Sequence, residues 1–403
     1  MKRLVSLLML IIFVFSFLCS CQKPTESLDN SNPSKTEETT VSEDENIIKI
    51  GVFEPLSGKD SYGGKAELVG IKYANELRNK VKIGEEEYKI ELVVADTKST
   101  DSGAVEAAQN LVSQNVNAVI GSYGCDSVFE AADIFNNAGI PVVSPTMSGM
   151  GLCESYSNIF SLGVSNNTLG EKIALYLYRN LGKRKICTVS VLGNDESQST
   201  VLYFTNEFND LGGKVINLKI EKDEDDFSSV ISRAVEEKCD AFFLPISYSY
   251  APSFISEIKN NEVSIPIVST YAWDIGAIFK PVEDSTVIAY TMAFCKSDTT
   301  SEFDNAMREW VNSNKQIKSL NGQSNVVSSI SLMSFDAYDV LINSMADKNV
   351  VSGKKLIKAI KKVSFNGKSG KIKFDSDGKT SREALYMKKT NNFTGHFGIL
   401  IEI

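Results

Sequence analysis

Two kinds of apolar segment alternate along most of this 403-residue chain. Short continuous apolar runs, typical of buried strands, are each followed by a longer segment whose apolar residues recur at the spacing of one helix face. The predicted strands are residues 47–53, 90–96, 117–124 (strand and loop), 141–144, 185–191, 214–220, 240–246 and 265–269. The predicted helices are residues 63–79, 102–114, 126–138, 168–181, 199–211, one that opens at Asp226 as N-cap, and 251–261. Strands that alternate with helices need crossover connections, so we expect parallel sheets covered on both faces.

The alternation falls into two runs, which indicate two lobes. The chain is 42% hydrophobic over its whole length, and residues 47–403 suffice to bury two cores of ordinary domain size. We therefore predict an α/β fold made of two doubly wound parallel-sheet lobes.

The loops after the strands are where function is expected. Ligands of doubly wound sheets bind outside the carboxyl ends of the strands. If the two lobes face each other, these loops line one cleft. They are residues 54–64, 122–127, 145–151, 192–198, 247–250 and 270–275.

The N-terminus has the pattern of an export signal. Lys2 and Arg3 precede an apolar stretch, residues 4–18, which is shorter than the ~20 residues that a spanning helix needs. The stretch ends in Leu18-Cys19-Ser20-Cys21, which resembles the lipobox of bacterial lipoproteins. The resemblance implies that residues 1–20 are removed and that Cys21 receives lipid, with fatty acids such as palmitate. An ordinary signal peptide with an incidental Cys21 stays open as the alternative.

Residues 21–46 then follow as a tether. They contain no aromatic residue and almost nothing that could enter a core, so we expect them to stay disordered. This predicts a protein anchored by lipid to the extracytoplasmic face of the cell membrane.

Charge and cysteine use exclude some classes of function. The net charge is −9 and we see no clustered lysine or arginine stripe, which argues against a nucleic-acid partner. The cysteines after residue 21 have no regular spacing, so the fold is not a disulfide scaffold. We expect Cys187 and Cys239 to be buried, and a bridge between Cys125 and Cys153 stays open.

Five stretches stand in order along the chain: IKIGVFEPLSGKDSYGGKAELVGIKYANE, VIGSYGCDSVFEAADIFNNAGIPVVSPT, DDFSSVISRA, YAWD and SGKIKFDSDGK. Together they resemble the branched-chain amino-acid binding proteins of ABC importers, which have the type I periplasmic-binding fold. The resemblance implies an extracytoplasmic receptor, with a hinge of three crossings, that captures a small ligand, foremost an amino acid, for permease subunits. It implies one lobe of residues 47–164 with 296–371 and another of residues 165–295 with 372–403.

Other readings of the function stay open beside this one. The ligand could be a small carboxylate or amide that is not an amino acid, or the protein could present its ligand to a separate membrane sensor. We expect a monomer in either case.

Carried over residue by residue, the resemblance implies ligand contacts in the first lobe. Thr146 and Ser148 match the positions that hold the α-amino and α-carboxylate groups, and hydroxyls suit a carboxylate. Cys125 stands where the family commonly has serine, and Tyr62 matches the aromatic residue that covers the ligand side chain.

The second lobe departs more from the family pattern. Ser197 and Tyr248 fall near the family's tyrosine positions, and the residue that should carry the acid for the ligand ammonium is Tyr271. An unpaired buried ammonium is costly. The candidates that could supply the missing charge are Asp126, Asp274, which could instead cap a helix, and Glu54, which could instead pin the hinge.

Motifs for catalysis and for cofactors are missing from the sequence. The single histidine, His396, lies in a late turn without a nucleophile or a second base beside it. No phosphate-binding loop or HExxH motif occurs, and Tyr386 stands where a calcium loop starting at Asp375 needs its bidentate acid. We predict no enzyme activity, no cofactor and no metal.

Overall fold

The computed structural model describes residues 46–149, 151–283, 285–382 and 384–403. The predicted signal peptide, Cys21 and the tether up to residue 45 lie outside the described residues. Asn46, the last residue of the predicted tether, already accepts a hydrogen bond from the Lys89 N–H at 2.8 Å. None of the helices in the described part combines the length and the apolarity needed to span a membrane.

The first lobe is built on a six-stranded sheet with the order β2-β3-β1-β4-β5-β6. Its strands are β1 (Ile47–Glu54), β2 (Lys80–Ile83), β3 (Glu86–Asp96), β4 (Ala118–Gly121), β5 (Val142–Ser144) and β6 (Ile159–Ser161). Its helices are α1 (Ser61–Leu77), α2 (Asp101–Ser113), α3 (Asp126–Asn137), α4 (Gly151–Ser155), α10 (Glu302–Ser313), α11 (Lys315–Leu320), α12 (Ser329–Lys348) and α13 (Gly353–Ile360). A hairpin of β12 (Ser364–Gly367) and β13 (Gly370–Lys373) follows α13.

The second lobe is built on a seven-stranded sheet with the order β15-β14-β11-β10-β9-β7-β8. Its strands are β7 (Lys185–Val191), β8 (Lys214–Ile220), β9 (Ala241–Leu244), β10 (Ile267–Ser269), β11 (Ala289–Ala293), β14 (Tyr386–Asn391) and β15 (His396–Glu402). Its longer helices are α5 (Asn166–Leu175), continued by a π-helical turn η1 (Tyr176–Asn180), α6 (Asp195–Asp210), α7 (Ser228–Glu236), α8 (Ala251–Asn260) and α9 (Phe279–Val282). Short 3₁₀ turns follow the strands: η2 (Tyr248–Tyr250), η3 (Tyr271–Trp273) and η4 (Gly276–Ile278).

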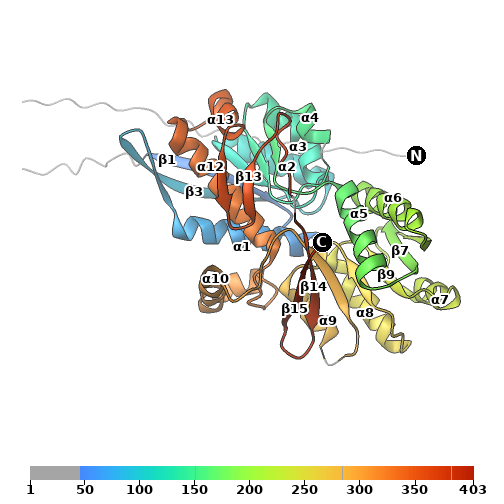
Figure 1. The fold of residues 1–403 in the computed structure, drawn as a ribbon. Coiled ribbons are helices and arrows are strands. Elements are labelled where there is room, and N and C mark those ends of the chain that lie inside the picture. The colour runs from blue at the N-terminus through green and yellow to red at the C-terminus, as the bar shows by residue number, and fades with distance from the viewer. Residues whose placement is uncertain (1–45, 150, 284, 383) are drawn as a thin grey trace, which may run out of the picture. The chain divides into compact units, whose positions relative to one another are not determined.

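The predicted fold class is confirmed. Strands β1, β3, β4, β5 and β6 pair in parallel, as do β7 to β11 in the second sheet, and the two sheets form separate groups in Figure 1. Strand β2 at the edge of the first sheet, and β14 and β15 at one side of the second, pair antiparallel, which the alternation did not predict. Asp226 does not take the predicted N-cap position of α7, which Phe227 occupies, but its carboxylate accepts the Ser228 N–H.

Side-chain alternation explains how the first sheet is covered on both faces. Ile50 and Val52 of β1 belong to the core shared with α1 and α12, whereas Phe53 belongs to a second core with α2 and α3. Helices α1 and α12 approach so closely that a Cβ at Gly70 would stand 1.9 Å from the Ser331 carbonyl oxygen. Glycine at position 70 is therefore a packing requirement.

The chain passes between the lobes three times within the described residues: after β6, after β11 and before β14. We predicted that the first lobe ends at residue 371. The chain contacts the first sheet beyond that point, because Lys379 forms an isolated parallel β-bridge with Ser161 at the end of β6.

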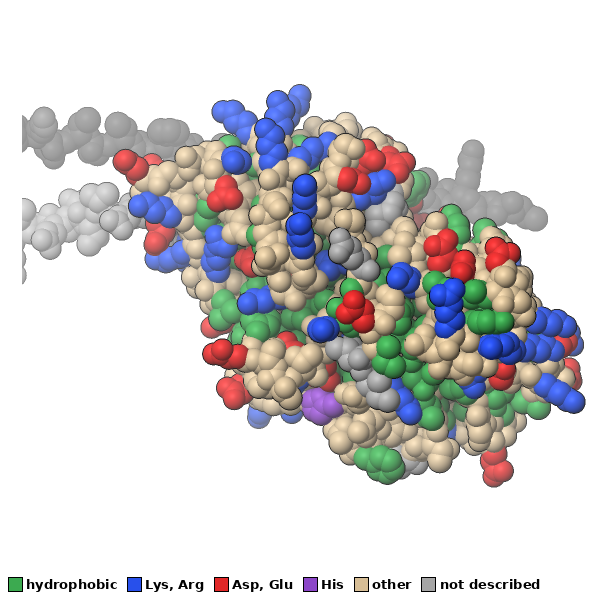
Figure 2. Space-filling model, in the orientation of Figure 1, with side chains coloured by type: hydrophobic (Ala, Val, Ile, Leu, Met, Phe, Trp, Pro, Cys, Tyr) green, Lys and Arg blue, Asp and Glu red, His purple; other side chains and the backbone are tan. Residues whose placement is uncertain are grey.

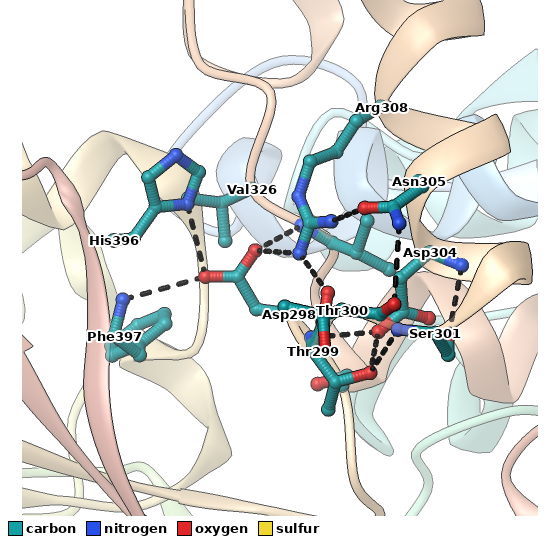
Figure 3. A network of polar contacts seen from close by, with 12 residues as sticks. Asp298, Thr299, Thr300, Ser301, Asp304, Asn305, Arg308, Val326, His396 and Phe397 are labelled. Atoms are coloured by element: carbon teal, nitrogen blue, oxygen red, sulfur yellow. Dashed lines mark hydrogen bonds and ion pairs between the residues drawn. The ribbon is translucent and has the colours of Figure 1, made fainter.

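Two buried polar clusters lie at these passages. In one, the Lys388 ammonium of β14 is 2.7 Å from the Asp274 carboxylate, and both side chains are at most 1% exposed. The same carboxylate accepts the Ser329 N–H at the start of α12, so it links the second lobe to the first. In the other cluster, the Asp298 carboxylate is 3.1 Å from the Arg308 guanidinium of α10. Its second oxygen is 3.2 Å from His396 Nδ1 of β15 (Figure 3).

Basic side chains gather on one part of the surface. Figure 2 shows lysines over α13 and over β13, and residues 354–373 contain eight lysines and no acidic residue. The sequence does contain a clustered basic segment, contrary to the expectation from its acidic total. The prediction that nucleic acid is not a partner then depends on the net charge alone.

We predict that Lys388→Met destabilises the protein by about 3–5 kcal/mol, because it leaves the buried Asp274 carboxylate without its cation. Urea unfolding at pH 7 measures this change. The matched control is Lys389→Met, whose partly exposed side chain neighbours Lys388 on the strand and should cost less than about 1 kcal/mol. Equal small costs for both variants would contradict a structural role for the pair.

Candidate functional site

A cavity opens where the carboxyl ends of both sheets meet. Its volume is about 150 Å³, comparable to an engineered cavity that holds a benzene ring. Five of the six predicted loops contribute to its wall, all except 145–151. Its polar and aromatic lining includes Lys59, Asp60, Tyr123, Cys125, Asp126, Glu196, Lys222, Tyr250 and Tyr271.

The first-lobe wall begins with the loop after β1. The Asp96 carboxylate at the end of β3 accepts the Leu56 N–H at 2.8 Å and the Ser57 hydroxyl at 2.7 Å. The Ser99 hydroxyl accepts the Asp60 N–H at 3.1 Å. These bonds fix the turn that carries Lys59 and Asp60 into the cavity wall.

Tyr123 forms the middle of the wall. Its ring packs against Gly63 so tightly that a Cβ there would lie 2.3 Å from the ring. Across the cavity its ring centroid is 5.8 Å from that of Tyr271 in the second lobe. The two rings therefore meet edge to face between the lobes.

Glu196 is the central acid of the second-lobe wall. It lies in the first turn of α6, which Asn194 caps by accepting the Ser197 N–H at 2.7 Å. The Tyr271 hydroxyl donates to Glu196 Oε1 at 2.7 Å. Burial, followed by the nearby carboxylates Asp126 and Asp60, raises the pKa of Glu196 to about 7, although the bond from Tyr271 opposes this shift.

A second acidic pair lies beneath the first-lobe wall. Thr146 Oγ1 donates to Glu67 Oε1 at 2.7 Å, and the Tyr123 N–H donates to Glu54 Oε2 at 2.9 Å. The other oxygens, Glu54 Oε1 and Glu67 Oε2, are buried without a donor. Burial and the neighbouring Glu67 raise the pKa of Glu54 well above its usual value, and burial raises the pKa of Glu67 to about 7. The two carboxyl groups therefore share a proton.

Three of the predicted ligand contacts lie in the cavity wall: Cys125, Asp126 and Tyr271. Thr146 and Ser148 lie just behind it. The Thr146 hydroxyl already donates to Glu67. The Ser148 hydroxyl is buried without a hydrogen bond of good geometry, and it lies close enough to Glu196 to lower the pKa of that carboxyl group.

Tyr62 and Tyr248 contact each other, not the cavity. Their rings meet edge to face at 4.6 Å across the lobes. The Tyr248 hydroxyl donates to the Ala277 carbonyl at 2.6 Å, and Tyr62 remains 41% exposed. Both residues thus lie beside the cavity, at a contact between the lobes.

Ser197, Asp274 and Glu54 also lie outside the cavity wall. Ser197 Oγ accepts the Val191 N–H at 3.0 Å and so fixes the turn after β7. Asp274 is paired with Lys388 near the lobe crossings, and Glu54 is paired with Glu67. The partner of Ser197 is local, whereas that of Asp274 comes from a distant segment that the local sequence does not reveal.

The cysteines of the described residues form no disulfide. Those after residue 21 are all free, so Cys125 and Cys153 are not bridged, and Cys187 and Cys239 are buried as predicted. Burial, then Glu196, raises the pKa of Cys125 far above its usual value, so its thiol stays protonated. No group of three potential metal ligands occurs among the described residues.

Sequence reasoning missed Asp60, Tyr123 and Glu196. All three stand in loops that the strand pattern had marked, so their position was available. An acidic residue at the start of a helix is ordinarily explained by the helix dipole, which is why Glu196 drew no attention.

The comparisons with known proteins agree with this architecture. The profile of the family described as periplasmic binding protein matches residues 47–393. The Leu/Ile/Val-binding protein homolog 3 of Brucella melitensis is 27% identical over 143 residues, which are 35% of this chain and 39% of that relative's length.

Solved structures share the fold. A leucine-binding protein from Thermotoga maritima has a TM-score of 0.76 at 22% identity, covering 88% of this chain and 98% of that one. A solute-binding protein from Rhodopseudomonas palustris in complex with 3,4-dihydroxybenzoic acid has a TM-score of 0.77 at 18% identity, covering 89% and 98%.

We predict that the shared proton makes stability fall as pH rises. A raised carboxyl pKa stabilises the fold fully below the unfolded value near 4.5, and this contribution is lost as pH rises through about 7. The loss is on the order of 3 kcal/mol. Glu67→Gln should flatten the decline of the melting temperature between pH 5 and 8, because an amide needs no shared proton. Glu130→Gln, on the exposed face of α3, should leave the slope unchanged; identical slopes in all three proteins would exclude the shared proton.

Proposed function

We propose that this chain, which belongs to the periplasmic binding protein family, captures an amino acid between its two lobes and delivers it to the permease of an ABC importer. The observation that carries the proposal is the cavity at the carboxyl ends of both sheets, walled by loops of both lobes. The relative named as a Leu/Ile/Val-binding protein supports the ligand class.

The wall offers partners for both charged groups of an amino acid. Glu196 supplies a carboxylate for the ammonium. It replaces the acid that was expected at position 271, where this chain has a tyrosine whose hydroxyl donates to Glu196. Helix α3 begins in the cavity wall, at Cys125 and Asp126. The N–H groups of its first turn can donate hydrogen bonds to the ligand carboxylate. Tyr123 and Tyr271 provide the apolar faces between them.

A carboxylate without an ammonium is the weaker candidate. A structural neighbour binds 3,4-dihydroxybenzoic acid, and the aromatic rings in the wall of this cavity could pack against such a ligand. However, Asp60, Asp126 and Glu196 would repel such an anion. The same repulsion disfavours any ligand without a positive group.

Closure of the lobes gives the capture mechanism. Lys59 of the first lobe pairs with Asp223 of the second at 2.7 Å. The Ser247 hydroxyl donates a hydrogen bond to the Lys59 carbonyl oxygen at 3.1 Å, and the rings of Tyr62 and Tyr248 pack against each other across the lobes. A ligand that touches both walls stabilises this closed state, and the open state releases it. Presentation of the ligand to a membrane sensor would use the same closure.

We also propose that the protein is a lipoprotein held on the extracytoplasmic face of the membrane through Cys21, as the lipobox-like segment indicates. The proposed role is binding and delivery without catalysis, by one copy of the chain. A tether of about 25 residues spans roughly 25–30 Å, enough to let the folded part turn toward a permease.

Ligand binding should raise the melting temperature. At a concentration one hundred times its dissociation constant, a ligand adds about 2.7 kcal/mol of stability. We expect at least one amino acid in a panel of amino acids, small amides and aromatic carboxylates to produce such a shift in the purified chain. A panel in which only benzoates or amides act would replace the amino acid by the alternative ligand class, and no response to any compound would contradict solute capture.

Substitution of two nearby cysteines, Cys21 and Cys19, tests lipid attachment. Cys21→Ser should abolish labelling by radioactive palmitate and release the protein from the membrane fraction, because the acylated sulfur is lost. Cys19→Ser should retain both, since Cys19 leaves with the signal peptide. Loss of labelling in the Cys19 variant alone would reassign the attachment site.

A further inference from the structure

The cavity wall carries more negative than positive side chains. Four acids line it, Asp60, Asp101, Asp126 and Glu196, against two lysines, Lys59 and Lys222. Lys59 is already paired with Asp223 at 2.7 Å and with the Tyr250 hydroxyl at 3.2 Å. Its charge is therefore compensated by a residue outside the wall, and the space for a ligand is net acidic.

The acids come from opposite lobes. Glu196 follows β7 of the second sheet, whereas Asp60 and Asp126 follow β1 and β4 of the first. Burial is the main cause of the raised pKa of Glu196, and Asp126 and then Asp60 from the first lobe raise it further. Closing the cleft thus brings like charges together, which opposes closure unless something positive lies between them.

Glu196 also has capacity left for a ligand. Its Oε1 accepts the Tyr271 hydroxyl, but Oε2 accepts no hydrogen bond from any described residue. Oε2 faces Gly124, where an added Cβ would still be 3.7 Å away. Beside it the Ser148 hydroxyl is 97% buried and has no hydrogen bond of good geometry. This hydroxyl lowers the pKa of Glu196, so it is a nearby donor to the carboxylate, and a cationic donor of a ligand would be a stronger one.

We infer that the ligand carries a net positive charge, and that one of its ammonium or guanidinium groups binds Glu196 between the two lobes. This inference rests on the proposed function and names the ligand class more narrowly. A neutral amino acid brings one ammonium and one carboxylate, so it leaves the acidic surplus of the wall uncompensated. A basic amino acid or a diamine cancels more of it.

Proton displacement follows from the surroundings of Glu196. The titratable groups that face it are Tyr271 of η3, Tyr123 and Cys125 before α3, Asp126 of α3, and Asp60 before α1. Only Lys59 and Lys222 in the same wall are basic. With a pKa of about 7, Glu196 is partly protonated at neutral pH and must ionise to hold a cation. Affinity for a cation should therefore rise as pH increases from 6 to 8.

The test is calorimetric titration of the full chain with L-arginine, L-lysine, putrescine and L-leucine at pH 6, 7 and 8. We expect at least one of the three cations to bind tenfold or more tightly than leucine, with affinity that increases with pH. The apparent enthalpy should depend on the ionisation enthalpy of the buffer, because a proton is released on binding.

Variants separate Glu196 from general acidity. Glu196→Gln should weaken cation binding tenfold or more and remove the buffer dependence, and Glu196→Asp should retain part of both. Glu130→Gln, outside the cavity on α3, should change neither. Circular dichroism shows whether each variant is folded. If Glu196→Gln does not fold, the cation affinity of Glu196→Asp is the measurement that tests the role of Glu196.

The outcomes distinguish this inference from the proposed function. Binding of leucine without binding of any cation would overturn the inference and leave amino-acid capture intact. Cation binding that is independent of pH and insensitive to Glu196→Gln would also overturn it. If none of the four compounds binds but another solute in the panel does, the ligand class inferred here is wrong; if no solute binds at all, the proposed function fails with it.

Discussion

Neutralisation of buried carboxyl groups is the constraint on which this structure depends. Acidic side chains lie inside the protein at the lobe crossings, beneath the cavity and in its wall, and each is neutralised differently. Asp274 has the Lys388 ammonium at 2.7 Å, and Glu54 and Glu67 share a proton. Glu196 has neutral hydroxyl groups beside it and no paired cation among the described residues, and burial favours its protonated form. The least compensated of these groups is the one that lies in the cavity.

These differences divide the acids between structure and function. A carboxylate paired with a buried lysine is fixed in one state, and it can join α12 to β14 without responding to a ligand. A carboxyl group whose pKa is near neutrality can exchange a proton for another cation at little cost. The physical state of Glu196 therefore links ligand charge, lobe closure and pH in one side chain.

Much of the fold could be predicted from the sequence. The strand and helix pattern located the parallel sheets, and the rule that ligands bind at carboxyl ends of strands marked five of the loops that line the cavity. Position alone did not tell which side chains of those loops face inward. Ser197 and Glu196 are neighbours, yet the serine fixes a turn and the acid enters the cavity. The antiparallel strands β2, β14 and β15 were missed because an alternation of strands and helices predicts parallel neighbours only.

The sequence by itself determined the two α/β lobes, the loops of the cleft and the resemblance to a family, because these depend on local periodicity and on short motifs. Only the tertiary structure decided which acids meet. Glu54 and Glu67 come from a strand and the helix after it, and Asp274 and Lys388 are separated by 114 positions. The charge state of a carboxyl group depends on burial and on neighbours from other segments, and these exist only once the chain has folded.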